Sequence, residues 1–200
     1  NVVFPPTANY TGPASFTYTV SDGNGGTSTA TVNVTVNAAN DPPAATGDTA
    51  STDEDTALTL TPATLLGNDA DLDGDTLTIS SVGNAQHGTV QIIDGQVRFV
   101  PEQDYFGPAS FDYLVDDGAG GQVSATVVLV LAPVNDAPAV QGESETIAED
   151  NALVYTQAQL LANDSDVDND HSELRITQVG GAVNGSVELL PNGTVRFVPD

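Results

Sequence analysis

The sequence predicts an all-β protein made of tandem Greek-key β-sandwich repeats, and three observations lead to this prediction. Similar stretches recur along the chain at a nearly constant spacing. Apolar and polar residues alternate in short runs, which is the pattern of half-buried strands. Tight-turn sequences such as Asp94-Gly95 and Asn192-Gly193 separate these runs, and short strands joined in this way are typical of a sandwich.

The repeat is visible when the chain is aligned with itself at a shift of about 95 residues. Residues 40–43 then match residues 135–138, and residues 65–69 match residues 160–164. The predicted division is into the C-terminal part of one repeat, one complete repeat, and the N-terminal part of a third: residues 1–39, 40–134 and 135–200.

The third copy contains no counterpart of the strands expected at residues 110–115 and 123–131. Its sheet should therefore have unpaired edges, and unpaired edges invite strand addition. We expect that residues 1–39 of one molecule can complement residues 135–200 of a neighbouring molecule.

Local patterns predict two further details. Thr61 and Pro62 are typical of a helix N-cap and of the first helical position, so residues 61–66 should form a single helical turn. Tyr18 and Tyr113 fall on apolar strand faces, and we expect both to be core residues of the kind that form a tyrosine corner.

Composition excludes several functions. The chain has 3 basic and 28 acidic residues, and a net charge of -25 makes nucleic acids and anionic membranes poor partners. It contains no cysteine, which excludes disulfides and thiolate metal sites. No apolar stretch is long enough for membrane insertion. The 39% of hydrophobic residues, arranged in alternating runs, indicates folded domains rather than an acidic disordered chain.

Aspartates occupy alternate positions in two loops. The first aspartate loop contains Asp69, Asp71, Asp73 and Asp75, and the second contains Asp164, Asp166, Asp168 and Asp170. Each pair of like charges at about 4 Å costs roughly 4 kcal/mol at an effective dielectric constant near 20. A divalent cation would remove this repulsion, and an all-oxygen set of ligands favours Ca²⁺.

The first aspartate loop is not an EF-hand, although residues 69–74 match its opening D-x-D-x-D-G pattern. The twelfth position of that motif requires a bidentate glutamate, and the chain has Ser80 there in one copy and Arg175 in the other. The calcium ligands must therefore include residues from elsewhere in the chain.

The linkers at residues 40–43 and 135–138 resemble those between cadherin repeats. The closer resemblance is to the bacterial cadherin-like tandem repeats of large RTX-type and biofilm surface adhesins. It is carried by the motifs L-L-x-N-D-x-D-x-D, H-G-T-V, F-x-P, Y-F-G-x-x-S-F-x-Y and D-D-G-x-G-G, which together extend over the whole chain. The L-D-R-E motif of cadherins is absent, and Glu102 lies near its place.

The resemblance implies calcium sites at the two junctions between repeats. The first junction would use Asn40, Asp41, Asp71, Asp73 and Asp117. The second would use Glu54, Asn135, Asp136, Asp166 and Asp168. The predicted metal set is completed by the remaining loop aspartates Asp69, Asp75 and Asp164, whereas Asp55, Asp104 and Asp112 are expected to face solvent.

The resemblance implies a calcium-rigidified structural spacer of an extracellular bacterial adhesin that is exported by type I secretion and supports cell adhesion or biofilm formation. Its partners would be the neighbouring repeats, and a host or cell-surface glycan or protein would be bound by other domains. Two alternatives remain: a carbohydrate-binding or homophilic module, and an accessory region of a secreted hydrolase. The absence of tryptophan and the placement of most tyrosines and phenylalanines on strand faces favour the spacer.

The residue pattern does not predict an enzyme. No serine has a partner histidine in a recognisable local motif, and paired carboxylates recur at every junction, where one active site per repeat is implausible. His87 is expected at a strand start, and His171 in a surface loop.

Overall fold

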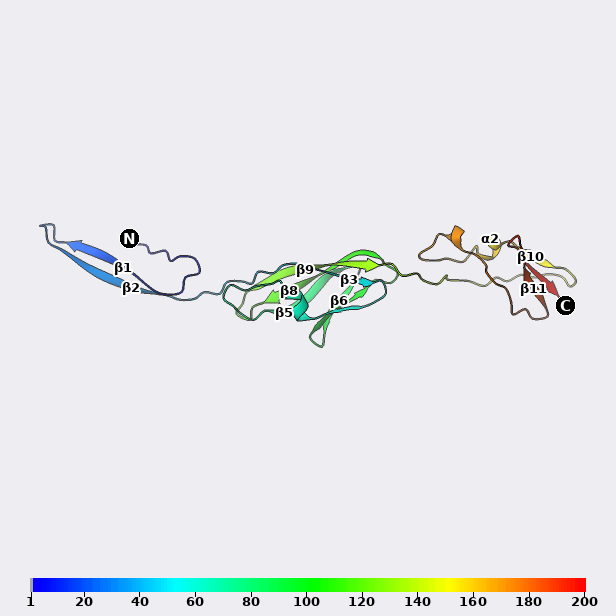
Figure 1. The fold of residues 1–200 in the computed structure, drawn as a ribbon, viewed down its shortest axis with the longest axis horizontal. Coiled ribbons are helices and arrows are strands. Elements are labelled where there is room, and N and C mark those ends of the chain that lie inside the picture. Colours follow the sequence, from blue (N-terminus) through cyan, green and yellow to red (C-terminus); the bar gives the residue numbers. More distant parts are fainter. Residues whose placement is uncertain (1) are drawn as a thin grey trace. The chain divides into compact units, whose positions relative to one another are not determined.

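The computed structural model describes residues 2–200, whose strands and short helices are labelled in Figure 1. The chain forms two compact units. The first contains most of residues 1–130, and the second contains residues 131–200 together with Asp53–Asp55 and Glu102–Gly107. Strands are the main regular secondary structure of both units, which confirms the predicted all-β fold. Among the described residues, no helix has the length and apolar character needed to cross a bilayer.

The complete repeat is a sandwich of two sheets. One sheet has the order β3-β9-β8-β5, formed by Asp48–Asp53, Gln122–Ala132, Gly107–Asp116 and Thr78–Gln86. The other has the order β4-β7-β6, formed by Leu58–Leu60, Gln96–Pro101 and Gly88–Ile93. Every second residue of β8 and β9 is buried, as expected for strands with one face on a core. Phe99 of β7 stacks on Phe111 of β8, with ring centroids 5.9 Å apart.

The predicted helical turn is confirmed as α1 (Pro62–Leu65). The Thr61 side chain caps it by accepting a hydrogen bond from the backbone N–H of Thr64, and Pro62 occupies its first turn. The turn directs Leu65 into the core, where its side chain is 1% exposed. The first aspartate loop follows directly, so α1 holds the start of that loop against the sandwich.

Tyr113 is a core residue, as predicted, and it connects the core with the first aspartate loop. Its hydroxyl lies 3.2 Å from the Thr46 carbonyl, 2.9 Å from Asp48 Oδ2 and 3.1 Å from the Leu65 carbonyl. Asp69 Oδ2 lies 3.4 Å from the same hydroxyl. Burial, and then the neighbouring Asp48 carboxylate, raise the pKa of Tyr113, which keeps the hydroxyl protonated and able to donate.

Replacing Tyr113 with phenylalanine is expected to lower the free energy of unfolding by about 1–3 kcal/mol, because buried acceptors lose their only shared donor while packing is retained. Urea denaturation of the complete chain would measure the change. Tyr18→Phe is the control, since the Tyr18 side chain is 48% exposed. Equal stability of Tyr113→Phe and the unaltered chain would contradict this role.

The first segment forms a separate hairpin of β1 (Gly12–Ser21) and β2 (Thr27–Val36). Phe4 stacks on Phe16 of this hairpin with the same 5.9 Å centroid distance as the Phe99–Phe111 pair. The prediction that Tyr18 is a core residue is wrong, because its side chain is 48% exposed. Tyr18 lies on the apolar face of β1, but among the described residues β1 and β2 pair only with each other.

The second unit contains one sheet, with the order β10-β12-β11. Its strands are Leu153–Tyr155, Val195–Pro199 and Gly185–Leu189, the counterparts of β4, β7 and β6. Helix α2 (Gln157–Leu160) repeats α1 and begins with a capping box between Thr156 and Gln159. The insertion around His171 forms the 3-10 helix η1 (His171–Glu173), with His171 exposed.

Candidate metal centres

The first linker is held against the first aspartate loop by backbone contacts. Ala44 and Ala70 form an antiparallel bridge. On one side of it, the Asp41 N–H donates to Asp73 Oδ2 at 2.8 Å. On the other side, the Thr46 N–H donates to Asp69 Oδ1 at 2.7 Å.

The second linker repeats this arrangement. Ala139 and Ser165 form the bridge. The Asp136 N–H donates to Asp168 Oδ2 at 2.6 Å, and the Gln141 N–H donates to Asp164 Oδ1 at 2.8 Å. The same geometry therefore arises twice from different neighbouring residues, and in both copies it places a linker aspartate beside a loop aspartate.

The aspartates of each loop have different roles. Asp69 and Asp164 use Oδ1 to hold the linker backbone, and Asp69 Oδ2 lies near the Tyr113 hydroxyl. Among the described residues, neither belongs to a group of three or more acidic side chains with close ligand atoms. The structure thus separates these two predicted ligands from the clusters formed by their neighbours.

Asp71, Asp73 and Asp75 form the first cluster, with ligand oxygens within 4.8 Å of one another. Asp71 Oδ1 accepts hydrogen bonds from the N–H groups of Asp73 and Asp75, at 2.9 and 3.2 Å. Asp71 Oδ2 is buried without a hydrogen-bond partner. Burial, and then repulsion from Asp71, Asp117 and Asp73, raise the pKa of Asp75. The cluster therefore has an uncompensated negative charge.

Asp117 joins this cluster from the end of β8 and is 5% exposed. Its Oδ2 accepts a hydrogen bond from Asn40 Nδ2 at 2.8 Å, and Oδ1 accepts from the N–H groups of Ala119 and Gly121. The Asn40 bond is the main cause that lowers the pKa of Asp117, so this carboxylate is held in its charged form. All five residues predicted for the first junction are therefore connected to one region.

Glu54, Asp136 and Asp168 form the second cluster, again within 4.8 Å. Glu54 follows β3 and is 2% exposed. Its backbone N–H donates to the Ala132 carbonyl, and its Oε1 accepts from the Val134 N–H at 2.6 Å. The second oxygen, Oε2, is buried without a partner. Residues from a strand end, a linker and the second aspartate loop thus meet at one point.

A third cluster joins Asp136 to Asp55 and Asp104, which sequence analysis missed as ligand candidates. Asp55 is exposed, as expected, but Asp104 is half-buried, and its N–H donates to Asp55 Oδ1 at 3.1 Å. Burial, and then repulsion from Asp104, Asp168, Asp55 and Glu54, raise the pKa of Asp136. One signal could have found Asp104: it lies two residues after Glu102, near the place of the missing L-D-R-E motif.

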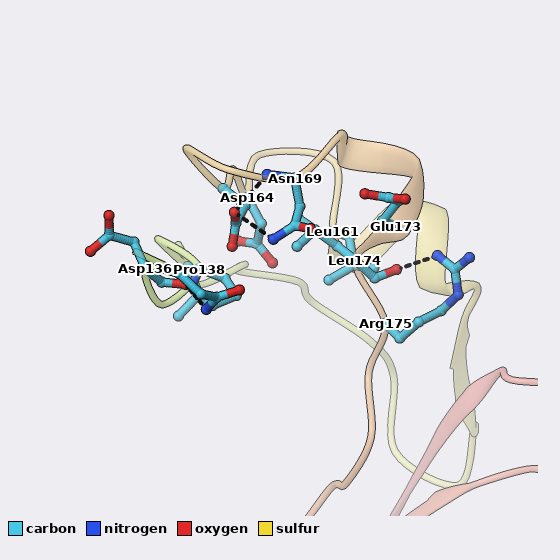
Figure 2. A pocket seen from close by; sticks show the side chains of 11 residues that line it. Asp136, Pro138, Leu161, Asp164, Asn169, Glu173, Leu174 and Arg175 are labelled. Atoms are coloured by element: carbon cyan, nitrogen blue, oxygen red, sulfur yellow. Dashed lines mark hydrogen bonds between the residues drawn. The ribbon is translucent and has the colours of Figure 1, made fainter. Parts of the chain in front are cut away.

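Figure 2 shows a pocket of about 360 Å³ between the second linker and the second aspartate loop. Asp166 lines it, and its Oδ1 accepts from Asn169 Nδ2 at 3.0 Å, the main cause that lowers the pKa of Asp166. Asn135 also lines the pocket, and its Nδ2 donates to the Asp136 carbonyl. The predicted residues Asn135 and Asp166 therefore lie in the same region as Asp136, outside its acidic clusters.

The donor atoms fit calcium. Three buried carboxylate oxygens of the described residues lack a hydrogen-bond partner, and each belongs to one of the clusters: Glu54 Oε2, Asp71 Oδ2 and Asp136 Oδ2. A buried anionic oxygen without a donor is costly, and a cation is the partner that satisfies several of them together. Because all the donors are oxygens in irregular loops, Ca²⁺ fits better than softer metals or Mg²⁺.

Comparison with known families supports the same assignment. The model of the cadherin-like domain family matches residues 1–37, 39–132 and 134–200. The chain therefore belongs to the cadherin-like domain family, which confirms that its repeats are cadherin-like. Domains of this family are structural or adhesion-type modules that act in tandem, and they are typically extracellular, calcium-binding and non-enzymatic.

Several solved structures resemble parts of the chain. An endo-fucoidan hydrolase from glycoside hydrolase family 107 is 24% identical over 64% of this chain and 20% of that protein, with a TM-score of 0.34. A variant of that hydrolase is 16% identical over 97% and 30%, with a TM-score of 0.37. Extracellular cadherin domains 1–4 of protocadherin gamma B7 are 16% identical over 94% and 49%, with a TM-score of 0.40. The chain thus spans less than half of each, and no curated protein matches it.

Proposed function

We propose that the chain is a calcium-rigidified structural spacer of a large extracellular bacterial adhesin. In this proposal residues 1–39, 40–134 and 135–200 belong to successive repeats, which are one another's direct partners. The adhesin is exported by type I secretion, stands at the bacterial cell surface and supports cell adhesion or biofilm formation. Other domains bind the host or cell-surface glycan or protein.

The observation that carries the proposal is the position of the buried, unpartnered carboxylate oxygens. Glu54 Oε2 comes from the end of a strand in the complete repeat, and Asp136 Oδ2 comes from the linker that follows it. Asp168, in the same cluster, belongs to the next aspartate loop. An ion bound by these three carboxylates would tie a repeat, its linker and the following repeat to one centre.

The clusters define the ligands that we propose. At the second linker, Glu54, Asp136 and Asp168 bind one ion, and Asp55 and Asp104 bind a second together with Asp136. At the first linker, Asp71, Asp73 and Asp75 are the central ligands, with Asn40, Asp41 and Asp117 around them. Asp69 and Asp164 position the linkers through Oδ1 rather than bind the ion.

Calcium would act on the linkers electrostatically. Without a cation, clustered carboxylates repel one another, and this repulsion decreases when the linker moves its aspartate away from the loop. With a cation, the same carboxylates attract a common centre, and the linker loses its freedom. Extracellular calcium modules bind with dissociation constants of about 10⁻⁴ to 10⁻³ M, so these centres would fill outside the cell and remain empty in the cytosol.

A distance measurement across the second linker tests the proposal. The chain has no cysteine, so Thr89→Cys on β6 and Ser186→Cys on β11 introduce the only two sites for spin labels. Both native side chains are exposed. We expect a broad distribution of label distances in a chelator and a narrow distribution in calcium, because the ion removes linker motion.

The control uses the same labelled chain with Asp136→Asn. Asp136 belongs to both clusters of the second linker, so this variant should keep a broad distribution in calcium. Distributions of equal width with and without calcium in the parent chain would rule out a rigidifying role.

A further inference from the structure

The complete repeat has a strand edge at each side of its two sheets. The edges are β3 and β5 in the order β3-β9-β8-β5, and β4 and β6 in the order β4-β7-β6. A free edge presents unpaired backbone N–H and C=O groups to other strands, so folded proteins protect their edges by shortness, charge, proline or irregular pairing. The edges of this repeat differ in that protection.

The edges at β3, β4 and β5 are protected. β3 has a carboxylate at each end, Asp48 and Asp53. β4 is only 3 residues long. β5 pairs irregularly with β8, because the register between them shifts twice along its length. Each of these features hinders the addition of a further strand.

The edge at β6 has none of these features. Its 6 residues, G-T-V-Q-I-I, include no charge and no proline, and they pair with β7 in one unbroken register. Within the part of the chain that the structure describes, β7 is the only strand paired with β6. The side chains of Ile92 and Ile93 are each 41% exposed. A neutral, apolar edge of this length is a site for edge-to-edge association.

The hairpin turn determines which backbone groups of β6 face outward. Its two residues, Asp94 and Gly95, have positive φ angles of 50° and 75°, as in the type I′ turn of a two-residue hairpin. The residues that flank such a turn form a hydrogen-bonded pair, and bonded and non-bonded pairs then alternate along the ladder. Gln91 therefore bonds to β7, whereas the N–H and C=O groups of Val90 and Ile92 point to the free edge.

Charge favours a second copy of β6 as the partner of this edge. Two copies of a chain of net charge -25 repel each other in general, but β6 is neutral, and the residue opposite Gln91 on β7 is the exposed cation Arg98. Two β6 strands can therefore meet without opposing carboxylates. In the third repeat the residue at the place of Gln91 is Glu188, which forms an ion pair with Arg196 at 3.1 Å. The equivalent strand β11 thus has the edge charge that β6 lacks.

We infer that β6 pairs with β6 of a second copy of the chain in an antiparallel, two-fold symmetric contact that joins two β4-β7-β6 sheets. Val90 of one copy faces Ile92 of the other, because residues with outward-facing backbone groups form the hydrogen-bonded pairs. Gln91 then faces Gln91 across the two-fold axis. A register with Val90 opposite itself would leave Ile93 without a partner in β6. Because the same surface is used by both copies, the contact closes at a dimer.

Cysteine cross-linking of the full chain tests this pairing. The chain has no cysteine, so Gln91→Cys introduces a single thiol. In the inferred dimer two such thiols face each other in a non-hydrogen-bonded pair, with Cα atoms about 4.5 Å apart, which is within the range of a disulfide. Mild oxidation with diamide should therefore produce covalent dimers at least about tenfold faster than in the control, because paired thiols have a high effective concentration.

The matched control is Ile93→Cys, on the same face of the same strand. In the inferred register this position faces Thr89 of the second copy, and the two copies of position 93 are offset by about 13 Å along the strands. Ile93→Cys alone should dimerise only at the slow rate of random collision. An equimolar mixture of Ile93→Cys and Thr89→Cys should form the mixed dimer quickly. Equal rates for Gln91→Cys and Ile93→Cys would overturn the inference.

Sedimentation velocity over a range of concentrations measures the association without a cross-link. The unaltered chain should show a monomer–dimer equilibrium, and Ile92→Pro should be monomeric, since proline removes an outward N–H and leaves the bonds to β7 in place. Gln91→Glu retains the fold if Arg98 accepts it as Arg196 accepts Glu188. This variant should raise the dissociation constant of the dimer several-fold, because two carboxylates would face each other.

The contact is independent of the proposed calcium centres. None of the acidic clusters found among the described residues includes a residue of β6, so the dimer should form in calcium and in chelator alike. A chain that is monomeric at every concentration in both conditions overturns the inference and leaves the calcium proposal standing. Association that Ile92→Pro leaves unchanged also overturns it, because the contact would then lie on another surface.

Discussion

Removal of calcium is expected to lower the thermal unfolding midpoint of the chain by about 10–20 °C. An ion at about 100 times its dissociation constant stabilises a folded site by about 2.7 kcal/mol, and about 10 mM calcium reaches this ratio when the dissociation constant is near 10⁻⁴ M. For a domain of about 60–100 residues, such as one repeat, a change of 1 kcal/mol in the free energy of unfolding shifts the midpoint by about 4–8 °C. Scanning calorimetry in calcium and in chelator would measure the shift.

Magnesium at equal ionic strength is the control for this experiment. General screening of a charge of -25 would stabilise the chain in either salt. Mg²⁺, however, requires a near-ideal octahedron at short distances, which irregular loops from separate segments do not provide. A midpoint that rises equally in both salts would show that screening, and not a bound ion, is responsible.

The fold was predictable from the sequence where local rules decide it. The α1 turn follows from Thr61 and Pro62, whose capping and backbone preferences act within one turn. The exposure of Tyr18 was not predictable in this way. Tyr18 and Tyr113 occupy the same place in a strand, but the side chain of Tyr18 is 48% exposed and that of Tyr113 is 1% exposed, because burial depends on tertiary contacts that the local pattern does not specify.

The candidate site was predictable as a set of segments but not as a set of contacts. The alternate spacing of the aspartates predicts the same ligand role for Asp69 and Asp71. In the structure, Asp69 Oδ1 accepts a hydrogen bond from the Thr46 N–H, whereas Asp71 Oδ2 has no donor. Asp104 enters a cluster only because the chain returns to Asp55 and Asp136 after forming β4 to β7. Such a meeting of distant residues depends on tertiary structure, which residue spacing alone does not specify.

Glu54→Gln is expected to have opposite effects on stability with and without calcium. In the calcium-free chain, a buried carboxylate whose Oε2 has no donor is replaced by a neutral amide of the same shape. The Val134 N–H can still donate to the amide oxygen, and the new amide N–H groups can donate to Asp136 and Asp168, whose oxygens lie within 4.8 Å. The free energy of unfolding should therefore rise by about 1–3 kcal/mol in chelator.

In calcium the same substitution should weaken ion binding and so reduce the stability that the ion provides. The amide places N–H groups where the ion needs an anionic oxygen, so calcium affinity at the second linker should fall at least tenfold, or by about 1.4 kcal/mol. Urea denaturation in both conditions, together with calorimetric calcium titration, would measure the two effects.

Glu149→Gln is the matched control for Glu54→Gln, because Glu149 is the counterpart of Glu54 in the third repeat and its side chain is exposed. This variant should change neither stability nor calcium affinity. A Glu54→Gln chain that is less stable in chelator and binds calcium normally would mean that the Glu54 carboxylate serves only its hydrogen bond to Val134. The opposite signs expected for Glu54→Gln arise because a buried charge that costs stability in the empty site becomes an attractive ligand once the ion is present.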